Sequence, residues 1–392
     1  MSTSPTLRPG FTATGKPRNP SNRLGLDYRR EAEAFVQRPR AILDAHLHLA
    51  GPGAVRIFRE AASLYGVGKF LSMTPLELVP AVQDELGDDV RFIAVPNYFG
   101  SDRRHEHGPG FLEAIETFHS MGSRVVKFWS APRGLDYGRE SGAPDLLRLD
   151  SANRLEAMRL AASLDMTFMV HVADPDTWFA TRYADPSLYG TKASHYDPLR
   201  RMLDRFAVPW IAAHCGGWPE DLDFLDTLLD AHPNLSLDIS ATKWVVREIS
   251  RHPRDRVVRF FARWRGRLLF GSDIVTHEDH LRGGEKTEMG AKASDADSAF
   301  DLYASRYWAY RTMLETAWTG ESPIADPDLA AVEPSRFNAE DAPTLRGLTL
   351  PEEILEDLYH EAARRFFEDA DGDEAQAPAR ASANRPVDRS TA

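Results

Sequence analysis

Short runs of nearly continuous apolar residues alternate along the chain with longer stretches in which apolar residues recur at helical spacing. Such runs are typical of strands buried on both faces of a sheet, and their alternation with helices implies right-handed βαβ units. Eight units of this kind predict a (β/α)8 TIM barrel of the α/β class. The eight runs are residues 41–49, 68–73, 90–95, 124–129, 167–172, 209–214, 235–239 and 267–272. The clearest helical stretches are 54–65, 111–121, 151–164, 219–231 and 244–264.

A doubly wound open sheet is the competing architecture, and no GxGxxG motif follows the first run to favour it. The barrel is predicted to occupy residues 39–369. Residues 1–38 read as an N-terminal arm, and 370–392 as a disordered tail, because the tail has no large apolar residue to bury. Two long insertions are expected after the fifth and eighth strands, at 173–196 and 274–298.

Composition removes several function classes. The 392 residues carry a formal net charge of −12 without a basic stripe, so no nucleic-acid partner is expected. The single cysteine, Cys215, excludes an internal disulfide and a multi-cysteine metal site. No apolar run reaches the ~18 residues of a membrane span. We therefore expect a soluble cytoplasmic enzyme without a membrane partner, in which any metal rests on histidine and carboxylate.

Polar residues stand out where the predicted strands end, which is where barrel enzymes build their sites. His46 and His48 lie in the first run, Lys127 in the fourth and His171 in the fifth; His214 ends the sixth, and Asp273 follows the eighth. Because residues two apart on a strand share a face, both imidazoles of the first run should enter the barrel mouth. Buried imidazoles need partners, and a metal would supply one to each.

An HxH pattern alone is weak evidence, since about 0.4 would arise by chance in a chain with this many histidines. A second one, His105-Glu106-His107, lies in a polar, glycine-rich stretch and is interpreted as solvent-exposed. The strength of the first pair comes from the joint order of His-x-His, His, His and Asp along the predicted strands.

This joint pattern resembles the amidohydrolase superfamily of metal-dependent barrel enzymes, and most of all its amidohydrolase-2 branch, which includes aminocarboxymuconate-semialdehyde and resorcylate-type decarboxylases. The segments that carry the resemblance are LDAHLHL, FMVHVAD, WIAAHCGG and LLFGSDI. The stretch 350–367 also resembles the closing helix of that branch, although Glu361-Ala362 stands where the branch often has Asn.

The resemblance implies one divalent metal, most simply Zn²⁺ with Mn²⁺, Fe²⁺ or Co²⁺ as options, bound by His46, His48, His171 and Asp273. Asp273 would also be the general base, and His214 would stabilise the oxyanion. Lys127 would contact a substrate carboxylate; a metal-bridging carbamate and a structural ion pair are its other readings. Arg133 could add a second anion contact, and Trp129 could wall the pocket. Cys215 is interpreted as a small buried residue rather than a nucleophile.

The function expected from these residues is hydrolysis, with metal-activated water attacking a small carboxylate-bearing substrate at a C–O, C–N or C–C bond. Non-oxidative decarboxylation by the same residues is the alternative. A homodimer is expected. A non-catalytic barrel and a metallo-nuclease are disfavoured, the first because every ligand is present and the second because of the negative charge.

Overall fold

Nine parallel strands form one sheet in the computed structural model, which describes residues 12–283 and 287–367. Their order is β8-β7-β6-β5-β4-β3-β2-β1-β9, so β1 to β8 follow one another in sequence order and β9 lies beside β1. All eight predicted runs are strands, which confirms the barrel prediction. The strands are β1 (Ile42–His48), β2 (Val67–Ser72), β3 (Val90–Ala94), β4 (Val125–Trp129), β5 (Thr167–His171), β6 (Trp210–Ala212), β7 (Leu235–Asp238), β8 (Leu268–Leu269) and β9 (Ile274–Val275).

The two ends of the sheet meet in one stretch of chain, residues 268–275. Its first part, β8, pairs with β7, and its last part, β9, pairs with β1 through Leu47 and His48. Asp273 lies between them with a φ of 60°, a left-handed conformation that bends the stretch. The insertion predicted to begin at residue 274 therefore begins after Val275, because Ile274 and Val275 still belong to the barrel wall.

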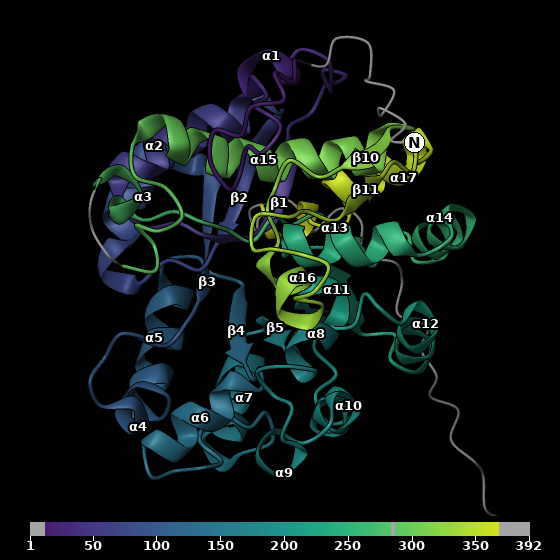
Figure 1. The fold of residues 1–392 in the computed structure, drawn as a ribbon. Coiled ribbons are helices and arrows are strands. Elements are labelled where there is room, and N and C mark those ends of the chain that lie inside the picture. Colours follow the sequence, from purple (N-terminus) through teal and green to yellow (C-terminus); the bar gives the residue numbers. More distant parts are fainter. Residues whose placement is uncertain (1–11, 284–286, 368–392) are drawn as a thin grey trace, which may run out of the picture.

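Helices surround the sheet, most of them on the outside of the barrel (Figure 1). They are α1 (Tyr28–Ala32), α2 (Pro52–Leu64), α3 (Val79–Leu86), α4 (Arg103–Glu106), α5 (Pro109–Ser120), α6 (Arg133–Glu140), α7 (Ala152–Ser163), α8 (Asp176–Phe179), α9 (Pro186–Tyr189), α10 (Tyr196–Arg205), α11 (Ala213–Gly216), α12 (Leu222–Ala231), α13 (Thr242–Arg251), α14 (Arg254–Arg263), α15 (Ala296–Glu315), α16 (Pro327–Val332) and α17 (Glu352–Glu356). Beyond them, β10 (Thr319–Glu321) and β11 (Thr344–Arg346) form a small antiparallel pair. No helix among the described residues is long and apolar enough to cross a membrane.

One predicted helix, 244–264, is wrong in its extent. The chain forms two helices there, α13 and α14, separated at His252 and Pro253. Proline disfavours the helical conformation of the residue before it, and His252 is accordingly extended, with φ −68° and ψ 153°.

The longest helix, α15, joins the N-terminal segment to the barrel, and Figure 1 shows it running beside α2. Within the segment, Asn22 is buried and its amide donates to Asp301 of α15 at 3.0 Å. Glu31 of α1 accepts a hydrogen bond from Trp308 of α15 at 3.1 Å. The described part of the predicted arm therefore lies packed on α15. The predicted tail, 370–392, falls outside the described residues.

Candidate active site

Two histidines of β1 and the aspartate between β8 and β9 come together at the carboxyl end of the barrel. His46, His48 and Asp273 each offer one ligand atom, and these atoms lie within 4.8 Å of one another. Nε2 of His48 is 3.3 Å, and Nε2 of His46 is 3.5 Å, from Oδ1 of Asp273. Three of the four predicted metal ligands therefore form one group.

Asp238, at the end of β7, holds His46 in one orientation. Nδ1 of His46 lies 2.9 Å from Oδ2 of Asp238, and both side chains are buried. A carboxylate can only accept, so the proton lies on Nδ1 and Nε2 presents a lone pair. Burial, and then the Lys127 ammonium, lower the pKa of His46 and keep its ring neutral.

Nε2 of His46 is itself buried and has no hydrogen-bond partner among the residues that the structure describes. A buried polar atom without a partner costs free energy. A neutral imidazole nitrogen whose opposite N–H is bound by a carboxylate is the usual arrangement of a metal-ligating histidine. The residues present therefore fit a metal ion.

His214 lies next to this group but in an unusual backbone conformation. Residues His214, Cys215, Gly216 and Gly217 all have positive φ, between 53° and 81°, and so form a left-handed turn directly after β6. Asp238 and Ser240 support the turn: Oδ1 of Asp238 accepts from the backbone N–H of His214 at 3.0 Å, and Nδ1 of His214 lies 2.8 Å from the Ser240 hydroxyl. The His46 and His214 rings are 4.9 Å apart between centroids. Left-handed geometry costs non-glycine residues roughly 1–2 kcal/mol each, so the turn is held by these contacts.

His171, the fourth predicted ligand, ends β5 and adjoins His214, with ring centroids 4.4 Å apart. Its Nε2 lies 2.9 Å from Oδ1 of Asp174, and the Tyr183 hydroxyl donates to Oδ2 of Asp174 at 3.0 Å. His171 is outside the group of three whose ligand atoms lie within 4.8 Å of one another. Asp174 therefore engages Nε2 of His171, and Nδ1 is the ring nitrogen that remains available as a metal ligand.

Asp273 is tied to β1 through its backbone, since its N–H donates to the His46 carbonyl at 2.8 Å. Burial alone would raise the pKa of its carboxyl, but the hydrogen bond from His48 and the nearby imidazoles of His214 and His46 outweigh burial and hold that pKa well below its usual range. Its side chain is 28 % exposed. Asp273 is thus an ionised carboxylate that a small molecule in the mouth can reach.

Lys127 lies in β4, where its side chain is buried and its Nζ has no hydrogen-bond partner among the described residues. Burial lowers the pKa of Lys127 to about 8, while the charges of Asp238 and Asp273 act in the opposite direction. Cys215 is also buried, and burial raises the pKa of its thiol, so it lacks the thiolate character of a nucleophile.

A cavity of about 440 Å³ opens next to His171. Trp129 and Arg133, both predicted to contact substrate, line it, as do Asp174 and Tyr183. Arg133 already pairs with Asp136 at 2.8 Å, and its side chain is 54 % exposed. The structure thus places Trp129, Arg133 and His171 around one space, with Lys127 not among the lining residues.

The sequence pattern of the amidohydrolase family matches residues 91–368, more than half of the chain. The chain belongs to the amidohydrolase family. The matched part contains Lys127, His171, His214 and Asp273, whereas the His46/His48 pair precedes it. The predicted family resemblance is therefore confirmed.

Solved structures that resemble this amidohydrolase include three enzymes. A probable 2-pyrone-4,6-dicarboxylic acid hydrolase from Acinetobacter baumannii is 13 % identical over 67 % of this chain and 91 % of its own, with a TM-score of 0.41. A 2,6-dihydroxybenzoate decarboxylase is 12 % identical over 84 % of this chain and 99 % of its own, with a TM-score of 0.42. The 4-oxalomesaconate hydratase of Rhodopseudomonas palustris is 12 % identical over 83 % and 95 %, with a TM-score of 0.40. No curated protein matches the sequence.

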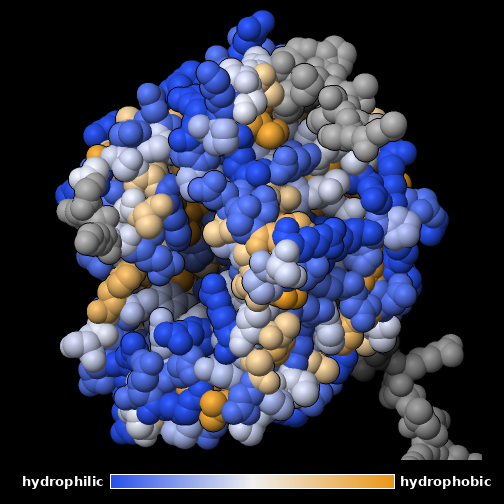
Figure 2. All heavy atoms as spheres, viewed as in Figure 1, coloured by the Kyte–Doolittle hydropathy of each residue, from blue (hydrophilic) through white to orange (hydrophobic). Residues whose placement is uncertain are grey.

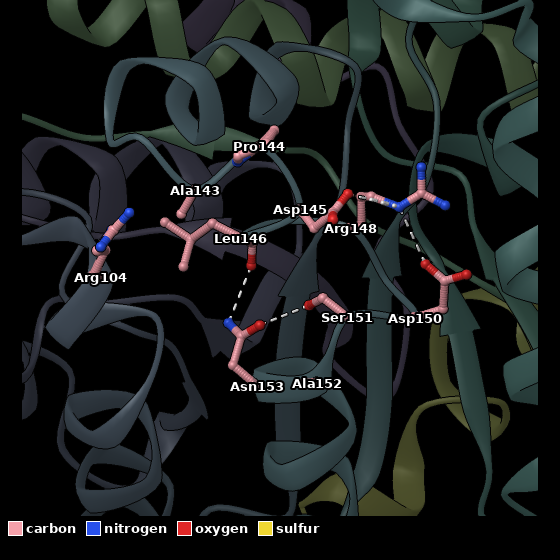
Figure 3. A pocket seen from close by; sticks show the side chains of 10 residues that line it. All are labelled: Arg104, Ala143, Pro144, Asp145, Leu146, Arg148, Asp150, Ser151, Ala152 and Asn153. Atoms are coloured by element: carbon pink, nitrogen blue, oxygen red, sulfur yellow. Dashed lines mark hydrogen bonds and ion pairs between the residues drawn. The ribbon is translucent and has the colours of Figure 1, made fainter.

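A second, shallower hollow of about 750 Å³ lies over the stretch between α6 and α7 of this amidohydrolase (Figure 3). Charged side chains surround it, and Asn153 crosses its floor to bond the Leu146 carbonyl at 3.1 Å. None of the predicted site residues lines it. Figure 2 shows that the face in view is mostly hydrophilic and hollowed near its middle.

Sequence reasoning assigned no role in the site to the residues that orient its histidines. Asp238 lies in the seventh apolar run and Asp174 in the fifth-strand insertion, and neither was predicted to bind a histidine. Asp44 in β1 was also missed. Its Oδ1 accepts from the backbone N–H groups of His46 and Ser272, at 3.2 and 3.0 Å. Burial raises the pKa of Asp44 to about 7.

The second HxH pair contains one wrong prediction. His105 is exposed as expected, but His107 is buried, with 2 % of its surface accessible. Its ring packs on Tyr98, with centroids 5.7 Å apart, and this contact explains the burial.

Proposed function

We propose that this protein is a metal-dependent hydrolase acting on a small carboxylate-bearing substrate. The observation that carries the proposal is the buried lone pair of His46 Nε2, which lies beside His48 and Asp273 and is oriented by Asp238. His46, His48 and Asp273 would hold the metal, with His171 joining through Nδ1.

The donor set contains only nitrogen and oxygen, which suits Zn²⁺ first and also Mn²⁺, Fe²⁺ or Co²⁺. When bound, a divalent ion supplies Lewis acidity and makes water a competent nucleophile near neutral pH. Asp238 and Asp174 each accept from one nitrogen of a ligand histidine, and such carboxylates fix the orientation and raise the basicity of the ring.

Asp273 is the general base of the proposed reaction. Its carboxylate is ionised and partly exposed, so it can accept a proton from the attacking water and return it to the leaving group. We assign stabilisation of the developing oxyanion to His214, whose ring lies 4.9 Å from that of His46 between centroids and whose Nδ1 faces the Ser240 hydroxyl.

Substrate binding is assigned to the side of the mouth formed by β4. Lys127 is a buried ammonium without a hydrogen-bond partner among the described residues, which favours contact with a carboxylate. Trp129 offers an aromatic wall, and Arg133 lies at the exposed edge of the same cavity.

The first test measures metal content by mass spectrometry on protein purified without added metal. We expect close to one equivalent in wild type and far less in His48→Ala, with the exposed His105→Ala as the matched control that retains its metal. Less than a tenth of an equivalent in wild type, with activity insensitive to chelator and to His48→Ala, would exclude the proposal.

The second test identifies the reaction. Lactones, amides and esters bearing a carboxylate are assayed for hydrolysis, and hydroxybenzoates and acyclic enoic acids for CO₂ release. Turnover in the first panel supports hydrolysis. Turnover confined to the second would replace it with decarboxylation by the same residues.

A further inference from the structure

A fully buried arginine lies outside the site described above. Arg154, in the first turn of α7, has no accessible surface. Its Nη2 donates to the Trp129 carbonyl at 3.2 Å, while Nε and Nη1 are buried without a hydrogen-bond partner in the described part of the chain. Burial lowers the pKa of Arg154 only to about 10, so the guanidinium remains charged at neutral pH.

The surroundings of Arg154 provide no counter-charge. Among the described residues no carboxylate forms an ion pair with it, and the nearby ionisable Tyr98 is neutral. Its guanidinium carbon lies 5.5 Å from the ring centroid of Phe111 and 5.9 Å from that of Phe128. Aromatic faces attract a cation but leave its N–H groups unsatisfied, and a buried charge without a counter-ion costs several kcal/mol in general.

A second buried donor lies nearby. His107, just before α5, has a buried Nδ1 with no hydrogen-bond partner in the described residues. Burial, and then the charges of Arg154 and Arg103, lower the pKa of His107 to about 3. Its ring is therefore neutral and can offer one N–H.

Two helix N-termini add to the positive potential at this place. Phe111 belongs to the first turn of α5 and Arg154 to the first turn of α7; both helices have twelve residues, and neither N-cap side chain bonds the helix. The two starts are tied together, since the Asn153 amide donates to the His107 carbonyl at 2.7 Å. A helix N-terminus favours negative charge through its free N–H groups and its dipole.

We propose that Arg154 and His107 form a buried binding site for a small inorganic anion, chloride in the simplest case. The Arg154 guanidinium and the N-termini of α5 and α7 all favour an anion. Because Arg154 is completely enclosed, the ligand must consist of one or a few atoms. The bound anion would neutralise the guanidinium and so stabilise its hydrogen bond to the carbonyl of Trp129, a residue that lines the cavity.

Bromide, which scatters anomalously and replaces chloride, is the direct probe. Crystals of the wild-type protein are soaked in sodium bromide, and we expect an anomalous peak within hydrogen-bond distance of Nε or Nη1 of Arg154. Crystals of Arg154→Met should lack that peak and retain those elsewhere. A wild-type map with bromide at other positions but none at Arg154 would overturn the proposal.

Thermal melting gives a second readout that needs no crystal. At constant ionic strength, replacing gluconate by chloride should raise the Tm of wild type by about 2 °C. His107→Phe should reduce the rise and Arg154→Met abolish it, while Arg159→Met, exposed on the same helix, should keep it. An equal rise in wild type and Arg154→Met would contradict the proposal. Should Arg154→Met fail to fold, Arg154→Lys and the wild-type soak decide the question.

Discussion

Histidines contact carboxylates at the carboxyl ends of β1, β7 and β8, whereas buried cations near the ends of β3 and β4 have nitrogens without a hydrogen-bond partner among the described residues. On the first side, Asp238 accepts from His46, from the His214 backbone and from Ser240. On the second side, Lys127 Nζ and two nitrogens of Arg154 have no hydrogen-bond partner among the described residues.

The difference indicates the sign of the charge that each side is suited to bind. Carboxylates on the first side fix imidazole protons so that a lone pair points into the mouth, an arrangement suited to a cation. Among the described residues, no carboxylate forms a hydrogen bond with the cations on the second side, although the chain as a whole is acidic. Such groups suit a carboxylate substrate at Lys127 and a small anion at Arg154. The comparison thus separates the proposed metal-binding side from the proposed anion-binding side.

The largest effect is expected at Asp273, where the two sides meet. Asp273→Asn should lower kcat/KM by on the order of 10³-fold, because it removes both a metal ligand and the general base. Asp165→Asn is the matched control: Asp165 also has a positive φ, 53°, but is exposed before β5, at the opposite end of the barrel. Steady-state kinetics on both variants measures the effect. If kcat/KM falls by less than tenfold in Asp273→Asn, Asp273 is not the general base.

A smaller effect is expected at Asp238, which contacts a proposed ligand and is itself outside the proposed ligand set. Asp238→Asn should weaken metal affinity by about 10–100-fold, since the amide no longer fixes the proton on Nδ1 of His46. Competition with a fluorescent chelator measures this affinity. The control is Asp204→Asn, which alters another His–Asp pair, in which the exposed Asp204 lies 3.4 Å from the buried His232. Equal affinities in the two variants would mean that Asp238 only supports the fold, and a melting curve of each variant reports folding separately.

The fold was predictable because its signals are local. Each strand of the barrel is one apolar run, and the polar residues that end the runs stand out against them. The end of α13 before Pro253 could also have been predicted from the sequence, since proline restricts the residue before it. The helical spacing of apolar residues from 244 to 264 led instead to the prediction of one continuous helix.

The orienting contacts were not predictable, because they depend on closure of the barrel. His46 and Asp238 are 192 residues apart, and no local pattern links them. The predicted exposure of His107 was wrong for a related reason. Its polar neighbours in the sequence indicated exposure, but a packing contact with Tyr98 buries its ring. The meeting of His46, His48 and Asp273 could thus be predicted from the sequence, and the network that orients the histidines could not.

The smallest effect concerns the pH dependence of stability at Lys127, measured on metal-free protein. Burial lowers its pKa from 10.5 to about 8 in the folded state, so below pH 8 folding carries the cost of a buried charge. That cost falls as pH rises from 8 towards 10.5, because the folded protein then releases the proton first. Lys127→Met has no ammonium to bury, so its folding free energy does not include this unfavourable contribution. Its stability advantage over wild type should therefore shrink by about 1 kcal/mol between pH 7 and pH 9.

Urea unfolding of both proteins at the two pH values measures this change, and comparing differences cancels groups that titrate equally in both. Lys69→Met is the control, since Lys69 is partly exposed and pairs with Asp89 at 2.9 Å; its difference from wild type should show no such narrowing. A pH-independent difference for Lys127→Met would mean that Lys127 keeps a neutralising partner in solution. Lys127 would then no longer belong to the anion-binding side, which would rest on Arg154 alone.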